Sequence, residues 1–292
     1  MKKIPQNFIK TFLIIFSCLS LMALFGFRGV GFSGDLWPKN DYKIFQRKIQ
    51  QFKKPQYSQL SFNQLIIKVG KSFLGTPYGF YTLDQSYPEK LVINLRKMDC
   101  LTYLENVLAI SKILKTKKLS FEDFKNEIQL IRYRSGGPVT YINRLHYYTE
   151  WLEDAEKKGI LKNIVGPDEF RKPIFLLSKN TSRKNDVDEL KRIENKLSQK
   201  TVKYFSCQTL ANTNLDELLQ DGDIVGFTSN VEGLDVNHVV FALKQEDRWT
   251  FLNASSVGEK EVEIYKGDLV EYCNRVKANT GIVLARPTEI TK

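Results

Sequence analysis

The C-terminal part of the chain, from Asp223 onward, alternates short apolar runs with turn residues. Such runs are typical of β-strands, and strands that follow one another closely pair as antiparallel hairpins. Upstream, apolar residues recur at the three- and four-residue spacing of helices. We therefore expect an α+β fold in which helices come first and an antiparallel sheet follows. The expected strands are 223–228, 238–244, 248–253, 261–265 and 280–286, with a helix near 268–275.

Two helix starts are marked by their capping residues. Ser61 and Gln64 have the pattern of a capping box, in which each side chain bonds the backbone N–H of the other residue. This pattern predicts a helix that begins after Ser61 and ends near Gly75. Ser120 predicts a second helix, which ends at the Ser-Gly-Gly-Pro segment of residues 135–138.

The pair Asp99-Cys100 places a cysteine at the start of another predicted helix. The unpaired N–H groups and the positive dipole end at this position favour the thiolate, which is the nucleophilic form of cysteine. By itself, a lone cysteine is more often a buried thiol that fills a gap between a helix and a sheet. The apolar face of the predicted helix is formed by Leu101, Leu104, Val107, Leu108, Ile113 and Leu114.

The chain contains two histidines, so the general base for such a thiol is His146 or His238. His238 opens an apolar run that we expect to form a β-hairpin with the next run. With the turn centred between Gln245 and Glu246, His238 lies opposite Asn253 on one face of the sheet. A cysteine nucleophile needs a base, and the base needs a carbonyl oxygen that fixes its tautomer. Each residue alone has an ordinary explanation, as a strand-edge histidine or a turn asparagine, but together with the helix-capping cysteine they indicate a catalytic set.

These residues resemble the NlpC-type superfamily of cell-wall cysteine peptidases, a papain-like group. Residues 75–78, Gly-Thr-Pro-Tyr, are similar to its upstream motif, and residues 221–227 to the segment that leads into the strand before the histidine. Within the superfamily, the chain resembles the N-acetylmuramoyl-L-alanine amidase-like family over about residues 60–287. The segments that carry this closer resemblance are 82–83, 91–96, 105–109, 131–134, 144–147 and 233–236.

The resemblance implies a papain-like fold in which the helix of the nucleophile packs on the antiparallel sheet. It implies that Tyr78 lines the site and donates to the oxyanion. Asp99 is either a helix cap or a group that recognises a polar part of the substrate. Arg144 and His146 are candidate substrate contacts, with an aromatic helix face and a snorkelling arginine as the alternative.

The function implied is that of a bacterial cysteine hydrolase that cuts the amide between N-acetylmuramic acid and L-alanine, in peptidoglycan or its muropeptide fragments. The long segment between Tyr78 and Cys100 and the aromatic residues of 141–151 match this amidase-like branch. One alternative is an endopeptidase that cuts the stem peptide after γ-D-glutamate. Another is a catalytically silent module that binds the cell wall.

The N-terminus has the pattern of an export signal. Lys2, Lys3 and Lys10 precede an apolar run from Phe12 to Phe27, which is short for a transmembrane span. We interpret residues 1–33 as a signal peptide or signal anchor, 34–60 as a lead-in helix or linker, and 61–292 as a single hydrolase domain. The protein is then expected in the periplasm or on the outer face of the cytoplasmic membrane, with membrane association through residues 12–27 as one interpretation.

Charge and motifs disfavour several other functions. A formal net charge of +11 suits an anionic cell envelope, but no aromatic-interleaved basic stripe or glycine-rich phosphate loop indicates nucleic acid or nucleotide binding. Neither Cys-x-x-Cys nor His-x-x-x-His occurs, so we expect no metal and no cofactor. Cys207 and Cys273 either pair in the oxidising compartment or remain two buried thiols.

Overall fold

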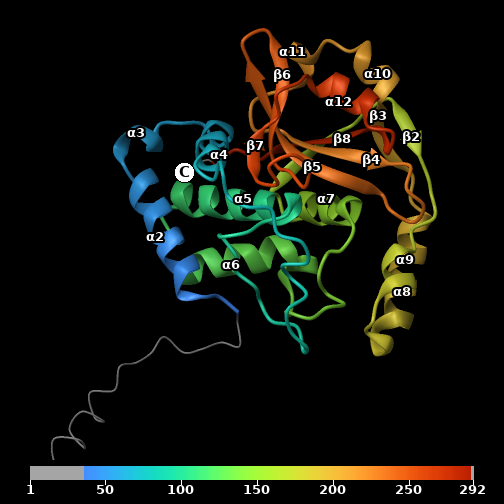
Figure 1. Ribbon diagram of the computed structural model, residues 1–292, viewed down its shortest axis with the longest axis horizontal. Coiled ribbons are helices and arrows are strands. Elements are labelled where there is room, and N and C mark those ends of the chain that lie inside the picture. Colours follow the sequence, from blue (N-terminus) through green and yellow to red (C-terminus); the bar gives the residue numbers. More distant parts are fainter. Residues whose placement is uncertain (1–35, 291–292) are drawn as a thin grey trace, which may run out of the picture. The chain divides into compact units, whose positions relative to one another are not determined.

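The computed structural model describes residues 36–290, and it shows a mixed α+β fold built on an antiparallel sheet (Figure 1). The strands follow the order β2-β3-β8-β4-β5-β6-β7, and β1 also pairs with β8. Their bounds are β1 Leu161–Ile164, β2 Asp168–Phe170, β3 Val202–Ser206, β4 Ile224–Ser229, β5 Val236–Gln245, β6 Arg248–Ala254, β7 Val262–Ile264 and β8 Asn279–Pro287.

Helices cover both faces of this sheet. In Figure 1, α5, α6 and α7 lie on one side of it, whereas α10 to α12 lie on the other. The bounds are α2 Lys39–Phe52, α3 Pro55–Ser58, α4 Phe62–Lys71, α5 Cys100–Thr116, α6 Phe121–Arg132, α7 Tyr148–Lys157, α8 Leu176–Asn180, α9 Val187–Ser198, α10 Cys207–Ala211, α11 Leu215–Leu218 and α12 Leu269–Arg275.

Strand β5 separates two hydrophobic cores. Phe241 and Leu243 point into the core beneath α4 and α5, whereas Val240 and Ala242 point into the core beneath α10 and α12. Because side chains alternate along a strand, a strand that is covered on both faces needs apolar residues at every position. This explains why the sequence around residues 239–243 is continuously apolar.

The predicted α+β class with an antiparallel sheet is confirmed, and each predicted strand has a counterpart. The predicted capping box at Ser61 and the predicted cap at Ser120 are also present. Both helices end earlier than predicted, α4 at Lys71 rather than near Gly75 and α6 at Arg132 rather than at residues 135–138. The interpretation of residues 144–151 as a helix with an aromatic face was wrong for residues 144–147. Helix α7 begins only at Tyr148, because the preceding backbone pairs Arg144 with Tyr133 in an isolated bridge.

The predicted hairpin register was also wrong. Gln245 pairs with Arg248, so the turn consists of Glu246 and Asp247 and is centred one residue later than predicted. Glu246 has φ +51°, in the left-handed region that two-residue hairpin turns require. With this register Asn253 is opposite Val240 rather than opposite His238.

The lead-in helix α2 contributes to the core through Phe45, Ile49 and Phe52. Its buried Asp41 accepts a hydrogen bond from the Leu95 backbone and pairs with Arg96. The predicted export signal, including the run 12–27, lies outside the described residues. Within residues 36–290, none of the helices has the length and apolar character needed to cross a bilayer.

A disulfide joins Cys207 at the start of α10 to Cys273 in α12, with the two Cα atoms 5.7 Å apart. Of the two alternatives that the sequence left open, pairing is the one found. The disulfide links the two helices that cover the second face of the sheet, and α12 lies over β6 and β8.

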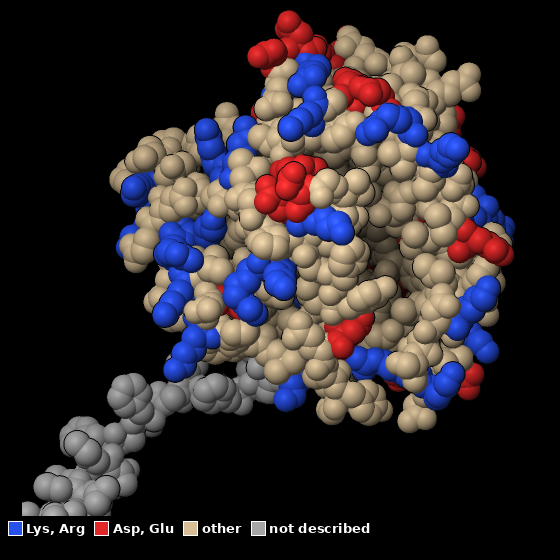
Figure 2. All heavy atoms as spheres, viewed as in Figure 1, with Lys and Arg blue, Asp and Glu red and all other residues tan. Residues whose placement is uncertain are grey.

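Charge is divided unevenly along the chain. Residues 36–132, which form α2 to α6, contain 17 Lys and Arg but 8 Asp and Glu, a net charge of +9. Residues 133–290 contain 22 Lys and Arg and 24 Asp and Glu, a net charge of −2. In Figure 2, basic side chains gather over the side of the molecule where Figure 1 shows α2 and α3.

Candidate active site

Cys100 is the first residue of α5, and its half-buried thiol lies where this helix meets the sheet. The backbone N–H groups of Val239 in β5, of Leu101 and of Cys100 itself lie close enough to the sulfur to favour its thiolate. Val239 directly follows His238 in the chain. The contact therefore places the beginning of β5 against the N-terminus of α5 and brings the two predicted catalytic residues to one location.

Burial keeps the thiol of Cys100 protonated. Loss of water raises its pKa to about 12, and the negative charge of Asp99 acts in the same direction. The three backbone N–H groups oppose this shift without overcoming it. The expectation from helix position alone, a thiolate favoured by the dipole, therefore does not describe the resting state, because burial outweighs the dipole.

His238 and Asn253 contact each other across β5 and β6. Nε2 of His238 is 2.9 Å from Oδ1 of Asn253, although the two residues are diagonal neighbours rather than opposite ones. Diagonal pairs on one face of a sheet are within reach of long side chains. The predicted contact is therefore present even though the register that led to it was wrong.

The Asn253 amide is held in one orientation because its Nδ2 donates to the Glu263 carbonyl at 3.3 Å. Its Oδ1 therefore faces His238 as an acceptor, which assigns the proton to Nε2 of the imidazole. The other nitrogen, Nδ1, is then the unprotonated one and is able to accept a proton. The geometry thus provides an oriented general base.

Aromatic rings surround the imidazole. Phe227 stacks parallel to it with ring centres 6.4 Å apart, and Tyr272 lies 6.3 Å away. Burial lowers the pKa of His238 to about 4, which the hydrogen bond with Asn253 partly opposes. At neutral pH the imidazole is uncharged, so both the candidate nucleophile and its candidate base rest in neutral form.

Tyr78 lies close enough to Cys100 for a thiolate at Cys100 to affect the pKa of the Tyr78 hydroxyl. Burial, then the charges of Cys100 and Asp99, raise the pKa of the Tyr78 hydroxyl well above its usual value. The hydroxyl is therefore a permanent hydrogen-bond donor. Its backbone is fixed on two sides, by a bridge to Met98 and by an N–H bond to the Lys260 carbonyl.

Asp99 caps α5. Its Oδ1 accepts from the backbone N–H and the hydroxyl of Thr102, each at 2.8 Å, and its own N–H donates to that hydroxyl. Of the two roles considered for Asp99, the structure contains the cap. Burial raises the pKa of this carboxyl, and the bonds from Thr102 oppose the shift.

The contacts of Arg144 and His146 are with other parts of the chain. Arg144 is 5% exposed and reaches Asp84 at 2.5 Å and Glu89 at 3.3 Å. His146 is 2.7 Å from the Tyr141 carbonyl through Nε2, and burial, followed by the charge of Arg144, lowers its pKa to about 3. Their expected role as substrate contacts stays a prediction.

The sequence interpretation missed Tyr272. This residue of α12 packs against His238, and the charge of Cys100 is among the causes that raise its pKa, after burial and Tyr265. Its position next to Cys273 was the available signal, because a disulfide anchors the short helix that carries it. Among residues 36–290, no cluster of three or more His, Cys, Asp or Glu side chains is arranged to hold a metal ion.

Comparisons with known proteins relate this chain to one family. The model of the N-acetylmuramoyl-L-alanine amidase-like family matches residues 68–282. An N-acetylmuramoyl-L-alanine amidase from Bacteroides uniformis, known from its crystal structure, is 32% identical, with a TM-score of 0.71; the match covers 78% of this chain and 99% of that one. None of the curated proteins matches.

Two further structures are similar. A Bacteroides fragilis protein that carries the provisional name of xylanase is 29% identical, with a TM-score of 0.70 and coverage of 75% and 99% of the two chains. A Legionella pneumophila protein shares the fold at 19% identity, with a TM-score of 0.63 and coverage of 85% and 96%. On the strength of the family match over most of its length, the chain belongs to the N-acetylmuramoyl-L-alanine amidase-like family.

Proposed function

We propose that this protein is a cysteine amidase that hydrolyses the bond between N-acetylmuramic acid and L-alanine in peptidoglycan or muropeptides. The observation that carries the proposal is the juxtaposition of Cys100 with the strand of His238, whose imidazole is oriented by Asn253. The family supports the bond, since the similar Bacteroides uniformis protein is named for it.

The first step forms a tetrahedral adduct, which becomes a thioester only when the C–N bond breaks in the second step. His238 Nδ1 accepts the Cys100 proton while the sulfur attacks the carbonyl carbon of the muramoyl lactyl group. Because both groups rest neutral, the proton leaves as the C–S bond forms rather than beforehand. The oxyanion accepts hydrogen bonds from the Cys100 backbone N–H and the Tyr78 hydroxyl.

The second step releases both products. His238 returns its proton to the leaving nitrogen, and the C–N bond breaks to free the peptide that begins with L-alanine. Water, deprotonated by His238, then attacks the thioester, and Cys100 recovers its proton as the sugar leaves with a carboxylate. Asn253 keeps the imidazole in one orientation through both proton transfers.

Two broader assignments belong to the same proposal. The order of cysteine, histidine and asparagine along the chain, with a helix carrying the nucleophile packed on an antiparallel sheet, supports a papain-like NlpC-type fold. The apolar run 12–27 after three lysines supports export to the periplasm or to the outer face of the membrane. The domain then consists of residues 61–292, with residues 34–60 as its lead-in.

The test is product identification with a defined muropeptide that contains both the sugar and the stem peptide. The amidase releases free sugar and an intact peptide that begins with L-alanine, as measured by mass spectrometry. Cleavage after γ-D-glutamate, which leaves L-alanine-D-glutamate on the sugar, would replace the amidase by the endopeptidase. Binding without any cleavage, unchanged in Cys100→Ala, would leave only a cell-wall-binding module.

A further inference from the structure

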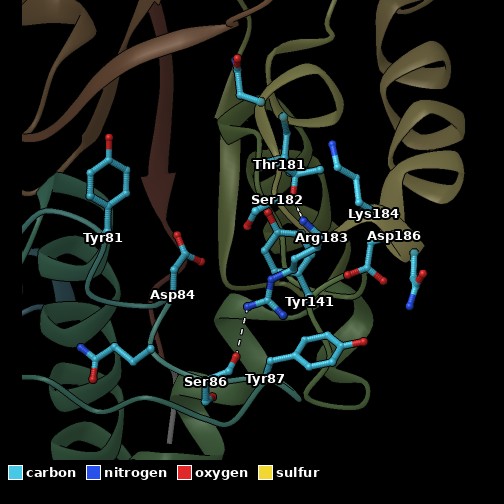
Figure 3. A pocket seen from close by; sticks show the side chains of 14 residues that line it. Tyr81, Asp84, Ser86, Tyr87, Tyr141, Thr181, Ser182, Arg183, Lys184 and Asp186 are labelled. Atoms are coloured by element: carbon cyan, nitrogen blue, oxygen red, sulfur yellow. Dashed lines mark hydrogen bonds between the residues drawn. The ribbon is translucent and has the colours of Figure 1, made fainter.

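A cavity of about 860 Å³ opens between two segments that are far apart in sequence. One wall is formed by residues 81–87 and the other by residues 177–186, with Tyr141 between them. Figure 3 shows Tyr81 and Asp84 on one side and Lys184 and Asp186 on the other. This volume lies within the range of about 300–1,000 Å³ that is usual for small-molecule sites.

The cavity is connected to the candidate active site by a row of aromatic rings. The ring of Tyr78, whose pKa is influenced by Cys100, packs on Phe80 with centres 4.8 Å apart. Phe80 in turn packs on Tyr81 at 6.4 Å, and Tyr81 lines the cavity. Two ring contacts, Tyr81 with Phe80 and Phe80 with Tyr78, therefore separate a ligand in the cavity from Tyr78 of the candidate active site.

The charged side chains of the cavity balance one another. It is lined by two cations, Arg183 and Lys184, and two anions, Asp84 and Asp186. Asp84 is paired with the buried Arg144 at 2.5 Å, and Arg183 lies 3.8 Å from Glu89. A ligand with several carboxylates, such as a stem peptide, gains little from such a lining, whereas a neutral ligand meets no unbalanced charge.

The uncharged lining suits a polyhydroxylated ring. Tyr81 and Tyr87 are 81% and 72% exposed, which is unusual for large aromatic side chains. Arg183 lies over the Tyr87 ring at 5.4 Å, so a ligand would stack on the opposite face of this ring. Arg183 is held over the ring of Tyr141 at 4.0 Å and bonds the Ser86 carbonyl, so this wall is ordered before a ligand arrives. The remaining polar lining residues offer amides and hydroxyls that match sugar hydroxyls and an acetamido group: Gln85, Ser86, Asn180, Thr181, Ser182 and Asn185.

We propose that this cavity is the sugar subsite of the enzyme and holds an N-acetylated pyranose ring on the acyl side of the bond that is cut, with Tyr87 and Tyr81 as stacking surfaces. The placement of the sugar on the acyl side of the scissile bond rests on the proposed amidase function. It places the stem peptide outside the cavity, on the other side of Cys100.

The first experiment measures binding without catalysis. The disaccharide of N-acetylglucosamine and N-acetylmuramic acid is titrated into the protein and followed by calorimetry. We expect Tyr87→Ala to weaken its binding about tenfold or more. Tyr42→Ala, which removes a partly exposed tyrosine on α2 far from this lining, is the matched control and should bind as the unchanged protein does. Equal affinity in the unchanged protein and Tyr87→Ala would overturn the subsite.

The second experiment compares two substrates with the same scissile bond, a muropeptide and a D-lactoyl peptide that lacks the sugar ring. We expect the unchanged protein to prefer the muropeptide in kcat/KM, and Tyr87→Ala to reduce this preference about tenfold. An equal loss of kcat/KM on both substrates would overturn the assignment. A loss of kcat/KM that grows with the length of the stem peptide would indicate that the peptide, rather than the sugar, occupies the cavity.

The two experiments separate this inference from the proposed function. Disaccharide binding that depends on Tyr87, combined with no cleavage of either substrate, would support the subsite and reject the amidase. Cleavage of both substrates with no preference for the sugar would support the amidase and reject the subsite.

Discussion

At the scale of single residues, the neutral resting state of Cys100 and His238 distinguishes this site from one with a preformed thiolate. With a pKa of about 12, the thiolate fraction of Cys100 rises about tenfold for each pH unit through neutrality. We therefore predict that inactivation by iodoacetamide accelerates about tenfold per pH unit from pH 6 to pH 10. A rate that is constant below pH 8 would instead reveal a thiolate–imidazolium pair.

Two controls make the alkylation result specific. Cys100→Ser should take up no label at this position. Mass mapping distinguishes Cys100 from Cys18, the other cysteine outside the Cys207–Cys273 disulfide. A chelator should leave hydrolysis unchanged, since the proposed chemistry uses a thiol. Loss of activity in EDTA that zinc restores would contradict the cysteine mechanism.

Substitution of the three site residues should give a graded series. Cys100→Ala and His238→Ala remove the proposed nucleophile and the proposed base, so we expect kcat/KM to fall at least about a thousandfold. Asn253→Ala removes only the group that orients the base and should cost about ten- to a hundredfold. The readout is initial rate on a muropeptide.

The matched control for this series is Asn237→Ala, which removes an amide from β5 that bonds Asn279 rather than the imidazole. It should retain near-normal turnover. If His146→Ala abolished turnover while His238→Ala preserved it, the assignment of the base would be wrong.

At the scale of secondary-structure elements, local sequence signals predicted the structure well. The capping boxes at Ser61 and Ser120 and the strand pattern after Asp223 depend on neighbouring residues, and the structure contains them. The hairpin register depends on which turn residues accept a positive φ, and Glu246 gives no sequence signal for this. Tyr272 reaches His238 only through tertiary packing, and its one signal in the sequence was the neighbouring Cys273. The cavity wall of residues 177–186 is likewise brought opposite residues 81–87 by tertiary packing, which spacing in the chain does not reveal.

The disulfide between α10 and α12 should stabilise the layer that covers the second core. A link between cysteines 66 positions apart restricts the unfolded chain and contributes about 4 kcal/mol to the free energy of unfolding. We predict that replacing Cys207 and Cys273 together by alanine lowers the melting temperature by about 10 °C. An unchanged melting temperature in calorimetry would show that the link does not constrain the unfolded chain.

The same substitution has a consequence at the site. Tyr272 precedes Cys273 and packs on the His238 ring, so a loosened α12 should reduce turnover before the sheet unfolds. Activity and unfolding are therefore measured together along a temperature series. In the unchanged protein the two curves should coincide, and in the double variant activity should be lost first.

At the scale of the whole molecule, the uneven charge predicts which side of the protein faces an anionic polymer. Peptidoglycan carries the carboxylates of its stem peptides, and the helices formed by residues 36–132 carry a net charge of +9. We predict that Cys100→Ala, used to prevent cleavage, binds purified sacculi through this side and is released as salt rises from about 50 to 500 mM. Sedimentation of protein with sacculi measures the bound fraction.

Which side of the molecule binds the sacculi is tested by reversing the charge of two residues on one helix at a time. Lys43 and Arg47 are exposed on α2, and Lys191 and Lys196 are exposed on α9, in the part of the chain with a net charge of −2. Replacing Lys43 and Arg47 by glutamate should weaken binding several-fold, because these side chains belong to the basic surface. The same change at Lys191 and Lys196 should have little effect, although it alters the total charge equally. Equal weakening by both pairs would mean that binding follows net charge alone and that no side of the molecule is preferred.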